Sequence, residues 1–451
     1  MRTTRFHDSA TGGLIALEPR DPGRVGIYAC GPTVYDRIHV GNARPYVVFS
    51  LLKRFLVHEG FDVTLVVNVT DVNDKIYDAA RERGVPSARL AAEMTAAYVA
   101  DTDALGLGRP DHEPLASASV PGIVDLIGAL IERDAAYAVE GDVYFRVRSD
   151  ARYGQLSGRD VDQMDQGEGV EGASLKEDPL DFALWKAQKP GEDTAWDAPW
   201  GRGRPGWHIE CSAMAEDLLG LGFDIHGGGI DLAFPHHENE AAQTRCGRGR
   251  ELARIWMHNG MLQMGGEKMA KSVGNVAGLP DTLAEHGRDA VIAFFVGGHY
   301  RQPIRFDAGT MADAAGRVRR IREAGRRLGP GASPGWSPAL ETQFFDALAD
   351  DFNTPAALAV VAEWVSRANR EPGPVGRDGL AAMLHVLGLE GLLAGSDNGP
   401  PAAVLALARE RTTAREARDW AASDRLREAI ADAGWEVRDG PDGPKLLPEA
   451  G

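Results

Sequence analysis

Residues 30–42 hold the side chains with the clearest capacity for chemistry. The thiol of Cys30 comes shortly before the turn His39-Val-Gly-Asn42. Imidazole and amide groups can donate hydrogen bonds to phosphate oxygens. Gly41 lets the backbone approach a phosphate closely, and a helix that begins at this turn favours negative charge at its N-terminus. The pattern predicts a nucleotide-phosphate site beside a thiol, with a plain helix cap as the alternative.

A second segment with phosphate chemistry follows much later in the chain. Lys268 and Lys271 lie three residues apart, between the pair Gly265-Gly266 and Gly274. Lysines on a mobile, glycine-flanked backbone can follow a triphosphate while its charge is redistributed, because each is a point charge on a flexible stem. A solvated lysine-rich turn would explain the same residues. Two phosphate-type segments in one chain are much rarer than either alone, and together they favour the triphosphate interpretation.

Three further side chains form a candidate set of metal donors with Cys30. They are Cys211, His236 and Glu240. The last two are four residues apart after a proline, so they share one face of a helix that begins there. Two sulfurs, a nitrogen and an oxygen are donors that zinc accepts. The cysteines are distant in sequence, however, and two reduced buried thiols beside an exposed acidic helix would give the same pattern.

The elements around these residues are predicted to be strand, helix and strand. Residues 24–29 are a short apolar run suited to a buried strand, and residues 62–67 are a second, β-branched run. Between them apolar residues recur at helical spacing from Val48 to Leu56, and Gly60 follows as a stop. Such a unit is normally a right-handed crossover in a parallel sheet, with ligands at the carboxyl ends of the strands. The thiol loop falls at that end of the predicted α/β fold.

The two phosphate segments resemble the signatures of the class I aminoacyl-tRNA synthetases. His39-Val-Gly-Asn42 matches the HIGH signature of that class, and Lys268-Met-Ala-Lys-Ser272 matches its KMSKS signature. Asn42 replaces the last histidine of HIGH, and Ala270 replaces the first serine of KMSKS. Asparagine can still donate a hydrogen bond, although it cannot become cationic, and both lysines remain. We expect these departures to tune ATP affinity without loss of activity.

Longer motifs make the chain similar to the cysteinyl-tRNA synthetases within this class. They are Cys-Gly-Pro-Thr-Val-Tyr-Asp from residue 30, Asn-Val-Thr-Asp-Val-Asn-Asp-Lys from residue 68 and Asp-Pro-Leu-Asp-Phe-Ala-Leu-Trp from residue 178. Zinc binds a thiolate strongly, whereas the serine hydroxyl is a harder and far more basic ligand. The resemblance therefore implies that the substrate sulfur also binds the metal and that no editing domain is required. It implies one zinc ion per subunit, held by Cys30, Cys211, His236 and Glu240.

The same resemblance implies roles in substrate binding. Thr70 is expected to help hold the amino group of L-cysteine, although a threonine after a strand often caps a turn. Trp207, beside His208, is expected to wall the amino-acid pocket and would equally suit the core. Residues 223–232 are predicted to be a strand end followed by glycines, and they resemble the segment on which class I enzymes lay the adenosine. The residues expected to contact the nucleotide are Gly41, Gly228, Gly229, Asp231 and Lys271.

The implied reaction has two steps. The carboxylate of cysteine attacks the α-phosphorus of ATP, which carries Mg²⁺, and gives cysteinyl-adenylate and pyrophosphate. The cysteinyl group then passes to the terminal adenosine of tRNA(Cys), initially at the 2′-hydroxyl. No protein general base is needed because the attacking carboxylate is already ionised, so catalysis is positioning plus electrostatics. The residues expected to stabilise charge on the phosphates are His39, Asn42, Lys268 and Lys271.

The chain is predicted to contain five regions. They are a class I Rossmann-like catalytic domain (1–120 and 203–255), an inserted connective-peptide domain (121–202), a KMAKS-loop and stem-contact region (256–310), a helical-bundle tRNA-binding domain (311–394) and a small C-terminal α+β anticodon-binding module (402–451). In the bundle, Thr354 is expected to cap a helix with Pro355 at its first position. The module is expected to be a helix pair followed by a hairpin.

Composition agrees with a multidomain globular protein. The chain has 451 residues, of which 43% are hydrophobic and 25% charged. It has no apolar stretch of membrane-spanning length and no signal-peptide pattern, so we expect a cytoplasmic protein without membrane association. Three cysteines fit a reducing compartment, with Cys246 a bystander. We also expect a monomer.

The net charge of −17 is unusual for a protein that binds RNA. Phosphate contacts, however, come from local basic surfaces and not from total charge. Residues 317–327 concentrate arginines on a helical pattern. A tRNA contact and a solvated helix face explain this concentration equally well, so the expectation of tRNA rests on the resemblance.

Two other functions compete with this interpretation. The first is the paralogous cysteine:glucosaminyl-inositol ligase of mycothiol biosynthesis, which shares the zinc site and the adenylation step but lacks a comparable C-terminal module. The second is a zinc-binding or RNA-binding protein without enzymatic activity. That second alternative leaves the paired phosphate segments unexplained.

Overall fold

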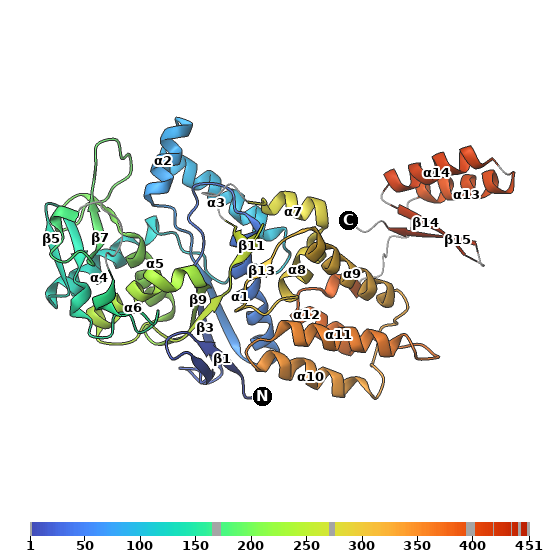
Figure 1. Cartoon of the computed structure of the whole chain (residues 1–451), viewed down its shortest axis with the longest axis horizontal. Helices are drawn as coiled ribbons and strands as arrows, with labels where there is room; N and C mark the ends of the chain where they lie inside the picture. The colour runs from blue at the N-terminus through green and yellow to red at the C-terminus, as the bar shows by residue number, and fades with distance from the viewer. Residues whose placement is uncertain are drawn as a thin grey trace.

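A four-stranded parallel sheet carries the predicted ligand-binding loop (Figure 1). The structure is a computed structural model that describes residues 2–164, 173–269, 276–393, 402–417, 419–433, 435–440 and 443–448. In spatial order the strands are β10 (Ala253–Asn259), β9 (Phe223–Gly229), β3 (Arg24–Ala29) and β4 (Asp62–Val67). Ile27 pairs with Leu65 on one side and Ile225 on the other, and all three are buried. The near-continuous apolar strands suit a parallel sheet that is covered on both faces.

The crossover helix α1 (Val40–His58) joins β3 to β4, which confirms the predicted strand-helix-strand unit. Its buried face includes Phe49, Leu52, Phe55 and Leu56, none of which is exposed. This face packs on the sheet, and the helix also contacts α8 and α12. The N-terminus of α1 therefore lies at the carboxyl ends of the strands, with the rest of the helix fixed by the core.

An inserted region follows α2 (Asp74–Arg83) and α3 (Ser87–Asp103) and has its own core. It contains α4 (Val120–Glu132) and an antiparallel sheet whose strands are β5 (Ala136–Val139), β6 (Asp142–Phe145), β7 (Phe182–Ala187) and β8 (Gly203–Pro205). The chain returns to the parallel sheet through α5 (Trp207–Leu219), and α6 (Glu238–Arg248) connects β9 to β10. Helices α4, α5 and α6 pack on one another, so the insertion borders the ligand end of the sheet.

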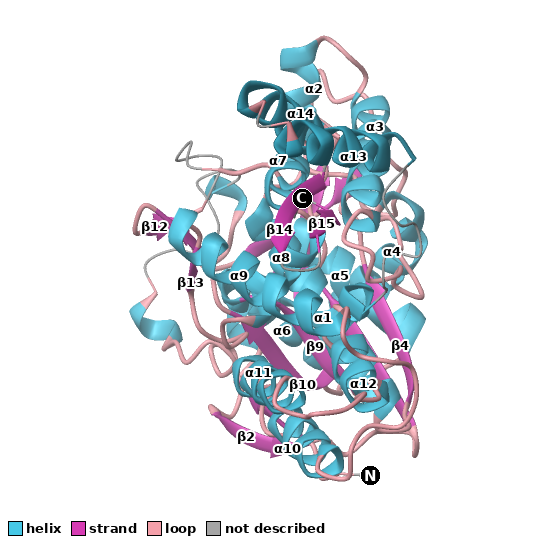
Figure 2. Cartoon of the chain, turned by 90° about the vertical axis from the view of Figure 1, so that its right-hand side faces the viewer, coloured by secondary structure: helices cyan, strands magenta, loops and turns pink. Residues whose placement is uncertain are grey.

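A small three-stranded sheet and a set of helices form the second half of the body. The sheet contains β11 (Leu262–Met264), β12 (Glu267–Lys268) and β13 (Ile304–Arg305), and the terminal hairpin β1 (Arg5–Asp8) and β2 (Gly13–Ala16) lies beside β10. The helices are α7 (Leu279–His286), α8 (Arg288–Val296), α9 (Ala308–Gly325), α10 (Ser337–Ala349), α11 (Thr354–Ala368) and α12 (Asp378–Val386). Figure 2 shows these helices in front of the parallel sheet.

The start of α11 differs by one residue from the prediction. Asn353 is the N-cap, and its side chain accepts a hydrogen bond from the backbone N–H of Ala356. Thr354 is the first helical residue and Pro355 the second. The prediction of Thr354 as the cap was wrong because asparagine is the stronger cap and stands one residue earlier.

The C-terminal module lies apart from the body at the right of Figure 1. Helices α13 (Ala402–Glu416) and α14 (Trp420–Asp432) pack on each other and precede the antiparallel hairpin β14 (Trp435–Gly440) and β15 (Gly443–Pro448). This is the predicted helix pair and hairpin. Among the described residues, no helix combines the length and the apolar character needed to span a bilayer.

Gly227 lies in a part of β9 where the packing leaves no room for a side chain. A Cβ at this position would lie 2.0 Å from Cζ of Phe49 and 2.9 Å from the carbonyl oxygen of Met257. We expect Gly227→Ala to lower the free energy of unfolding by about 1–3 kcal/mol, because overpacking a core forces side chains and backbone to shift. Thermal unfolding of the purified variant measures the effect.

Gly128→Ala in α4 is the matched control. Nothing lies within 4 Å of a Cβ at Gly128, which is inside the helix. Alanine is better than glycine in a helix interior by about 0.5–1 kcal/mol, so this variant should be neutral or stabilised. Equal stability of the two variants would contradict the packing argument.

Candidate metal and nucleotide site

Four predicted donors from separate elements meet at the carboxyl end of the sheet. Cys30 follows β3, Cys211 lies in α5, and His236 and Glu240 lie at the start of the segment that becomes α6. The two sulfurs are 3.8 Å apart, and the Cys30 sulfur is 3.7 Å from Oε1 of Glu240. Nε2 of His236 is 3.1 Å from the same oxygen. All four donor atoms lie within 4.8 Å of one another, and all four residues are buried.

Local structure explains how His236 and Glu240 face each other. A single π-helical turn (Ala233–His237) precedes α6, which begins at Glu238. The prediction that the two side chains share one face is confirmed, although the α-helix begins later than the sequence suggested. Cys30 is fixed from its other side because its backbone N–H donates to the carbonyl of Gly227.

The geometry of the four donors fits zinc. Two thiolates that are each about 2.3 Å from a tetrahedral zinc ion lie about 3.8 Å apart, and imidazole and carboxylate donors at about 2.0–2.2 Å lie about 3.3 Å apart. The corresponding separations are 3.8 Å between the sulfurs and 3.1 Å between His236 and Glu240. The donor set is therefore compact enough to hold one zinc ion without rearrangement of the backbone.

The structure adds two histidines that the sequence did not single out. His226 and His237 form a second compact donor set with Cys30 and Glu240. Nε2 of His226 is 2.8 Å from Oε2 of Glu240, whereas His236 approaches Oε1. The first set has two thiolates, the softer ligands that zinc favours. His226 then supports the far oxygen of Glu240, which is the usual arrangement behind a metal ligand.

A network of imidazoles orients this cluster. The Nδ1 atoms of His208 and His236 are 2.8 Å apart, which leaves Nε2 of His236 directed at Glu240. Nδ1 of His237 is 2.7 Å from Nε2 of His258. Trp207 stacks on His236 with ring centroids 4.2 Å apart. The predicted pocket-wall residue therefore lies directly against a predicted metal ligand.

Burial sets the protonation state of the cluster in the absence of a cation. It raises the pKa of the Cys30 thiol well above its ordinary value, and the hydrogen bond with Cys211 raises it further. Burial lowers the pKa of His236 well below its ordinary value, with a further lowering from His208. A neutral Cys30 thiol and a neutral His236 imidazole are therefore favoured, and a bound cation reverses the preference for the thiol.

The loop that contains Thr70 is tied to the thiol loop. Thr70 is buried, and Asn68 accepts a hydrogen bond from the backbone N–H of Gly31 at 2.9 Å. The next residue, Asp71, accepts hydrogen bonds from the backbone N–H and the hydroxyl of Ser117. These contacts, with the hydrogen bond from the backbone N–H of Thr70 to the carbonyl of Pro32, hold Thr70 against the loop that follows Cys30. Its proposed contact with the amino group stays a prediction.

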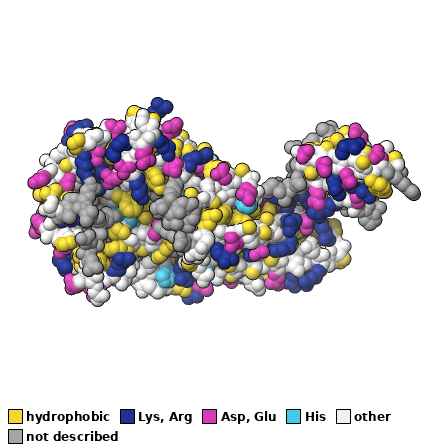
Figure 3. Space-filling view, turned by 45° about the horizontal axis from the view of Figure 1, so that its top comes forward, with side chains coloured by type: hydrophobic (Ala, Val, Ile, Leu, Met, Phe, Trp, Pro, Cys, Tyr) yellow, Lys and Arg dark blue, Asp and Glu magenta, His cyan; other side chains and the backbone are white. Residues whose placement is uncertain are grey.

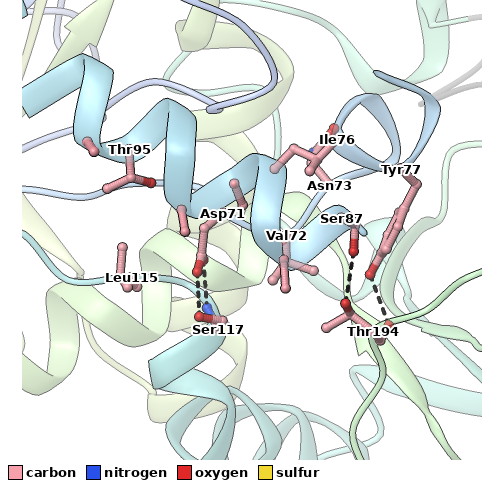
Figure 4. Close-up of a pocket in the computed structure, with 14 residues that line it drawn as sticks. Asp71, Val72, Asn73, Ile76, Tyr77, Ser87, Thr95, Leu115, Ser117 and Thr194 are labelled. Atoms are coloured by element: carbon pink, nitrogen blue, oxygen red, sulfur yellow. Dashed lines mark hydrogen bonds between the residues drawn. The ribbon is translucent and has the colours of Figure 1, made fainter. Parts of the chain in front are cut away.

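A separate cavity of about 440 Å³ opens beside the same loop (Figure 4). Alanines of α3 and the side chains of Val72, Ile76 and Leu115 make the aliphatic part of its wall. Tyr77 and Ser87 reach Thr194 of the inserted region at its rim, with Tyr77 donating to the carbonyl at 3.0 Å. None of the four metal donors lines this cavity, so it is distinct from the cluster.

The predicted phosphate turn begins α1. His39 is the N-cap, and its backbone N–H donates to Oδ1 of Asn42 at 3.3 Å. The amide nitrogen of Asn42 therefore remains the group that could donate to a ligand. A Cβ at Gly41 would lie 2.9 Å from the His39 ring, so glycine lets the imidazole fold over the turn.

Gly228 and Gly229 lie inside β9, which differs from the prediction. They were expected to follow the strand, but they pair with His258 and Asn259 of β10. A Cβ at Gly228 would lie 3.2 Å from the His237 ring, and one at Gly229 would lie 2.4 Å from Oδ1 of Asp231. Glycine is therefore required within the strand itself, because other groups approach the backbone closely there.

The lysine loop lies near the phosphate turn at both of its described ends. Ala270 and Lys271 fall outside the described residues, and so does the side chain of Lys268, so their predicted roles are not tested. Before the loop, Leu262 lies 3.7 Å from the position of a Cβ on Gly41. After it, the carbonyl of Ala277 accepts a hydrogen bond from the backbone N–H of Val40 at 3.0 Å.

Comparison with known proteins decides the family. Residues 16–316 match the tRNA synthetases class I (C) catalytic domain, residues 343–389 match the DALR domain, and residues 397–444 match the cysteinyl-tRNA ligase anticodon binding domain. The chain belongs to the cysteinyl-tRNA synthetase family. The resemblance inferred from the motifs is confirmed, as is an enzyme of class I aminoacyl-tRNA synthetase type.

Individual relatives span the whole synthetase. The protein named cysteine–tRNA ligase from Halorhodospira halophila (strain DSM 244 / SL1) is 45% identical, over 98% of this chain and 98% of its own. The one from Parvibaculum lavamentivorans (strain DS-1 / DSM 13023 / NCIMB 13966) is 46% identical, over 95% and 94%. A solved methionyl-tRNA synthetase of Mycobacterium tuberculosis, in complex with methionyl-adenylate, covers 82% of this chain and 88% of its own with a TM-score of 0.57 and 18% identity. That likeness supports the class I fold.

Zinc loading of this synthetase should weaken as the pH falls. Because the raised pKa keeps the Cys30 thiol protonated, a zinc ion must displace its proton, and acid competes with the metal. We expect the apparent affinity of metal-free protein to fall continuously from about pH 8 to about pH 6. Competition with a chelator at fixed zinc measures it. An affinity that does not change with pH would contradict binding through the buried thiols.

Proposed function

We propose that this synthetase joins L-cysteine to tRNA(Cys) in two steps and selects cysteine through one zinc ion held by Cys30, Cys211, His236 and Glu240. The observation that carries the proposal is the convergence of these four donors, within 4.8 Å of one another, in a chain of this family. A zinc ion bound there would stabilise the substrate as a thiolate and disfavour the serine hydroxyl.

The amino-acid pocket would be completed by residues next to the donors. Trp207, stacked on His236, would wall the pocket, and Thr70 would hold the substrate amino group. A pocket with apolar contacts alone discriminates one small group by only about 1–3 kcal/mol. Discrimination by the metal is therefore the feature that makes accurate selection feasible without a second site.

Adenylation would depend on electrostatics at the start of α1. The cysteine carboxylate attacks the α-phosphorus, a new carboxyl oxygen–phosphorus bond forms, and pyrophosphate leaves with its Mg²⁺. His39 and Asn42 would donate to the phosphates from one side, and Lys268 and Lys271 from the other. The adenosine would lie along Gly228 and Gly229, and Asp231 would meet its ribose. Support comes from the anchoring of both described ends of the lysine loop beside the phosphate turn.

Transfer to tRNA involves the helical bundle and the C-terminal module. Arg317, Arg320 and Arg327 line one side of a groove of about 700 Å³, and Leu358 with neighbouring residues of α11 lines the other. Figure 3 shows Lys and Arg side chains gathered on this part of the body, next to the module. We propose that this groove contacts phosphates of the tRNA, which favours one of the two interpretations of the arginine-rich helix.

The mycothiol-type ligase is not supported. Residues 397–444 match an anticodon-binding domain, and the relatives described above are named cysteine–tRNA ligase. A cytoplasmic monomer remains part of the proposal.

The zinc proposal predicts a selective effect of Cys211→Ser. Loss of a thiolate donor should reduce zinc content and slow cysteine-dependent pyrophosphate exchange by at least about 10–100-fold, since even residues behind a metal ligand have effects of that size. Binding of ATP alone should change little. Exchange kinetics and metal analysis of the same preparation measure both.

Cys246→Ser is the matched control, because Cys246 lies outside both donor sets. It should keep zinc and activity. Equal losses in the two variants, or equal losses of cysteine and ATP binding in Cys211→Ser, would argue against recognition by the metal. Wild-type exchange followed by transfer to glucosaminyl-inositol and not to tRNA would overturn the assigned acceptor.

The groove predicts a tRNA-specific defect. The double variant Arg320→Gln, Arg327→Gln should raise KM for tRNA and lower the salt dependence of tRNA binding. The slope of log affinity against log salt should fall by about 0.7–0.9 for each phosphate that the protein no longer neutralises. Pyrophosphate exchange without tRNA should not change. Filter binding at several salt concentrations and aminoacylation kinetics test both.

Arg24→Gln is the control for net charge. Arg24 begins β3 at the end of the sheet opposite the ligand loops, and its side chain is 75% exposed. Arg24→Gln should not weaken tRNA binding as much, per charge removed, as the groove variant does. An equal loss of affinity per charge would show a general electrostatic effect and would contradict a specific contact at the groove.

A further inference from the structure

One arginine in the second turn of α1 is buried among main-chain carbonyls. Arg44 is 1% exposed and is one of the largest fully buried side chains of the described residues. Its guanidinium donates to five carbonyl oxygens at 2.5–3.2 Å and to no carboxylate among the described residues. These acceptors are the carbonyls of Gly260, Met261, His299, Tyr300 and Gln302.

The five carbonyls belong to two segments that hold the small three-stranded sheet. Gly260 and Met261 connect β10 to β11, and residues 299–302 connect α8 to β13. β11 pairs with both β12 and β13. Since β11 and β12 lead into the lysine loop, the segments bound by Arg44 determine where that loop starts.

The two segments are packed too closely for another residue at Gly260. A Cβ there would lie 2.4 Å from the carbonyl carbon and oxygen of Gln302. The backbone N–H of Gly260 donates to the carbonyl of Tyr300 at 2.7 Å, and that of Ile304 donates to the carbonyl of Met261 at 3.1 Å. Arg44 therefore fills a position from which a single side chain reaches both segments.

The chemistry of Arg44 is suited to this role. A guanidinium presents five N–H donors in a planar fork, whereas lysine presents a compact point charge. Burial lowers the pKa of Arg44 to about 10, so the group stays cationic near neutral pH. A buried cation without a carboxylate partner is unfavourable for stability, and its hydrogen bonds to fixed carbonyls are the compensation that the fold offers.

The helix that carries Arg44 also begins with the phosphate turn. His39 and Asn42 lie within the turn before it. Beyond the lysine loop, the carbonyl of Ala277 accepts a hydrogen bond from the backbone N–H of Val40 in the same turn. The segment 299–302 is held from its other side by Asp351 of the bundle, which accepts from the Tyr300 hydroxyl at 2.8 Å and from Arg301 at 2.7 Å. Arg44 thus links the phosphate turn to a sheet that the bundle also holds.

We propose that Arg44 is a positioning residue for ATP: it fixes the separation between the phosphate turn of α1 and the hairpin that leads into the lysine loop. The inference rests on the proposed roles of these two segments in nucleotide binding. It assigns to Arg44 no contact with substrate. Its effect is expected on the nucleotide half of the reaction and not on cysteine or zinc.

The test compares Arg44→Lys and Arg44→Gln with Arg54→Gln in cysteine-dependent pyrophosphate exchange. Arg54 lies on the same helix and also donates to carbonyls, of His385 and Leu107, but it faces the bundle and has a carboxylate partner in Glu390. For the Arg44 variants we expect KM for ATP to rise at least tenfold, with KM for cysteine and zinc content unchanged. The KM for ATP of Arg44→Lys should lie between that of the wild type and that of Arg44→Gln. Arg54→Gln should leave both KM values unchanged at a similar loss in melting temperature.

Gly260→Ala displaces the same segment while the arginine at position 44 is kept, and it keeps the test decisive if Arg44→Gln does not fold. It should reproduce the selective rise in KM for ATP. Equal rises in KM for ATP and cysteine, or a loss of activity in the Arg44 variants that only follows their melting temperature, would overturn the proposal. Absence of cysteine-dependent exchange in the zinc-replete wild type would instead overturn the proposed function, so the two failures are distinguishable.

Discussion

The buried carboxylate of Glu240 is the interaction on which the site depends. One of its oxygens lies beside Cys30 and His236, and the other lies beside His226. A carboxyl group buried without hydrogen-bond partners would be strongly unfavourable in such a place. The fold places groups from the loop after β3, from β9 and from the turn before α6 around it, so one side chain constrains the approach of all three. The same arrangement brings the thiols within the separation that a tetrahedral metal requires.

Local sequence was enough to predict much of this fold. The strand-helix-strand unit around α1 followed from apolar periodicity and a glycine stop, and the C-terminal helix pair and hairpin followed from short-range patterns. His236 and Glu240 were paired correctly because four residues make about one helical turn. In each of these cases the contacts that matter are close in the chain.

What the sequence did not predict depends on contacts between distant segments. His226 and His237 join the donors only because β9 and the π turn meet beside Cys30. Gly228 is required within its strand because the imidazole of His237, a residue beyond the strand, lies where a side chain would be. Arginine is usually a surface residue, and nothing in the local sequence marks Arg44 as buried. Only the tertiary fold surrounds it with carbonyls. The cap at Asn353 was missed for a different reason, since two good capping residues stood side by side.

The C-terminal module has little to hold it in place. Its own core contains only four buried hydrophobic residues among those described, Val404, Ala408, Ile430 and Val437. Its described ion pair to the body, Arg438 with Glu323, spans 3.8 Å between half-exposed side chains. Cooperative unfolding needs extensive shared burial, so we expect the module and the body to unfold as separate units. Heating should open the module first, and tryptophan fluorescence reports on both units, because Trp420 and Trp435 lie in the module while Trp185 and Trp364 are buried in the body.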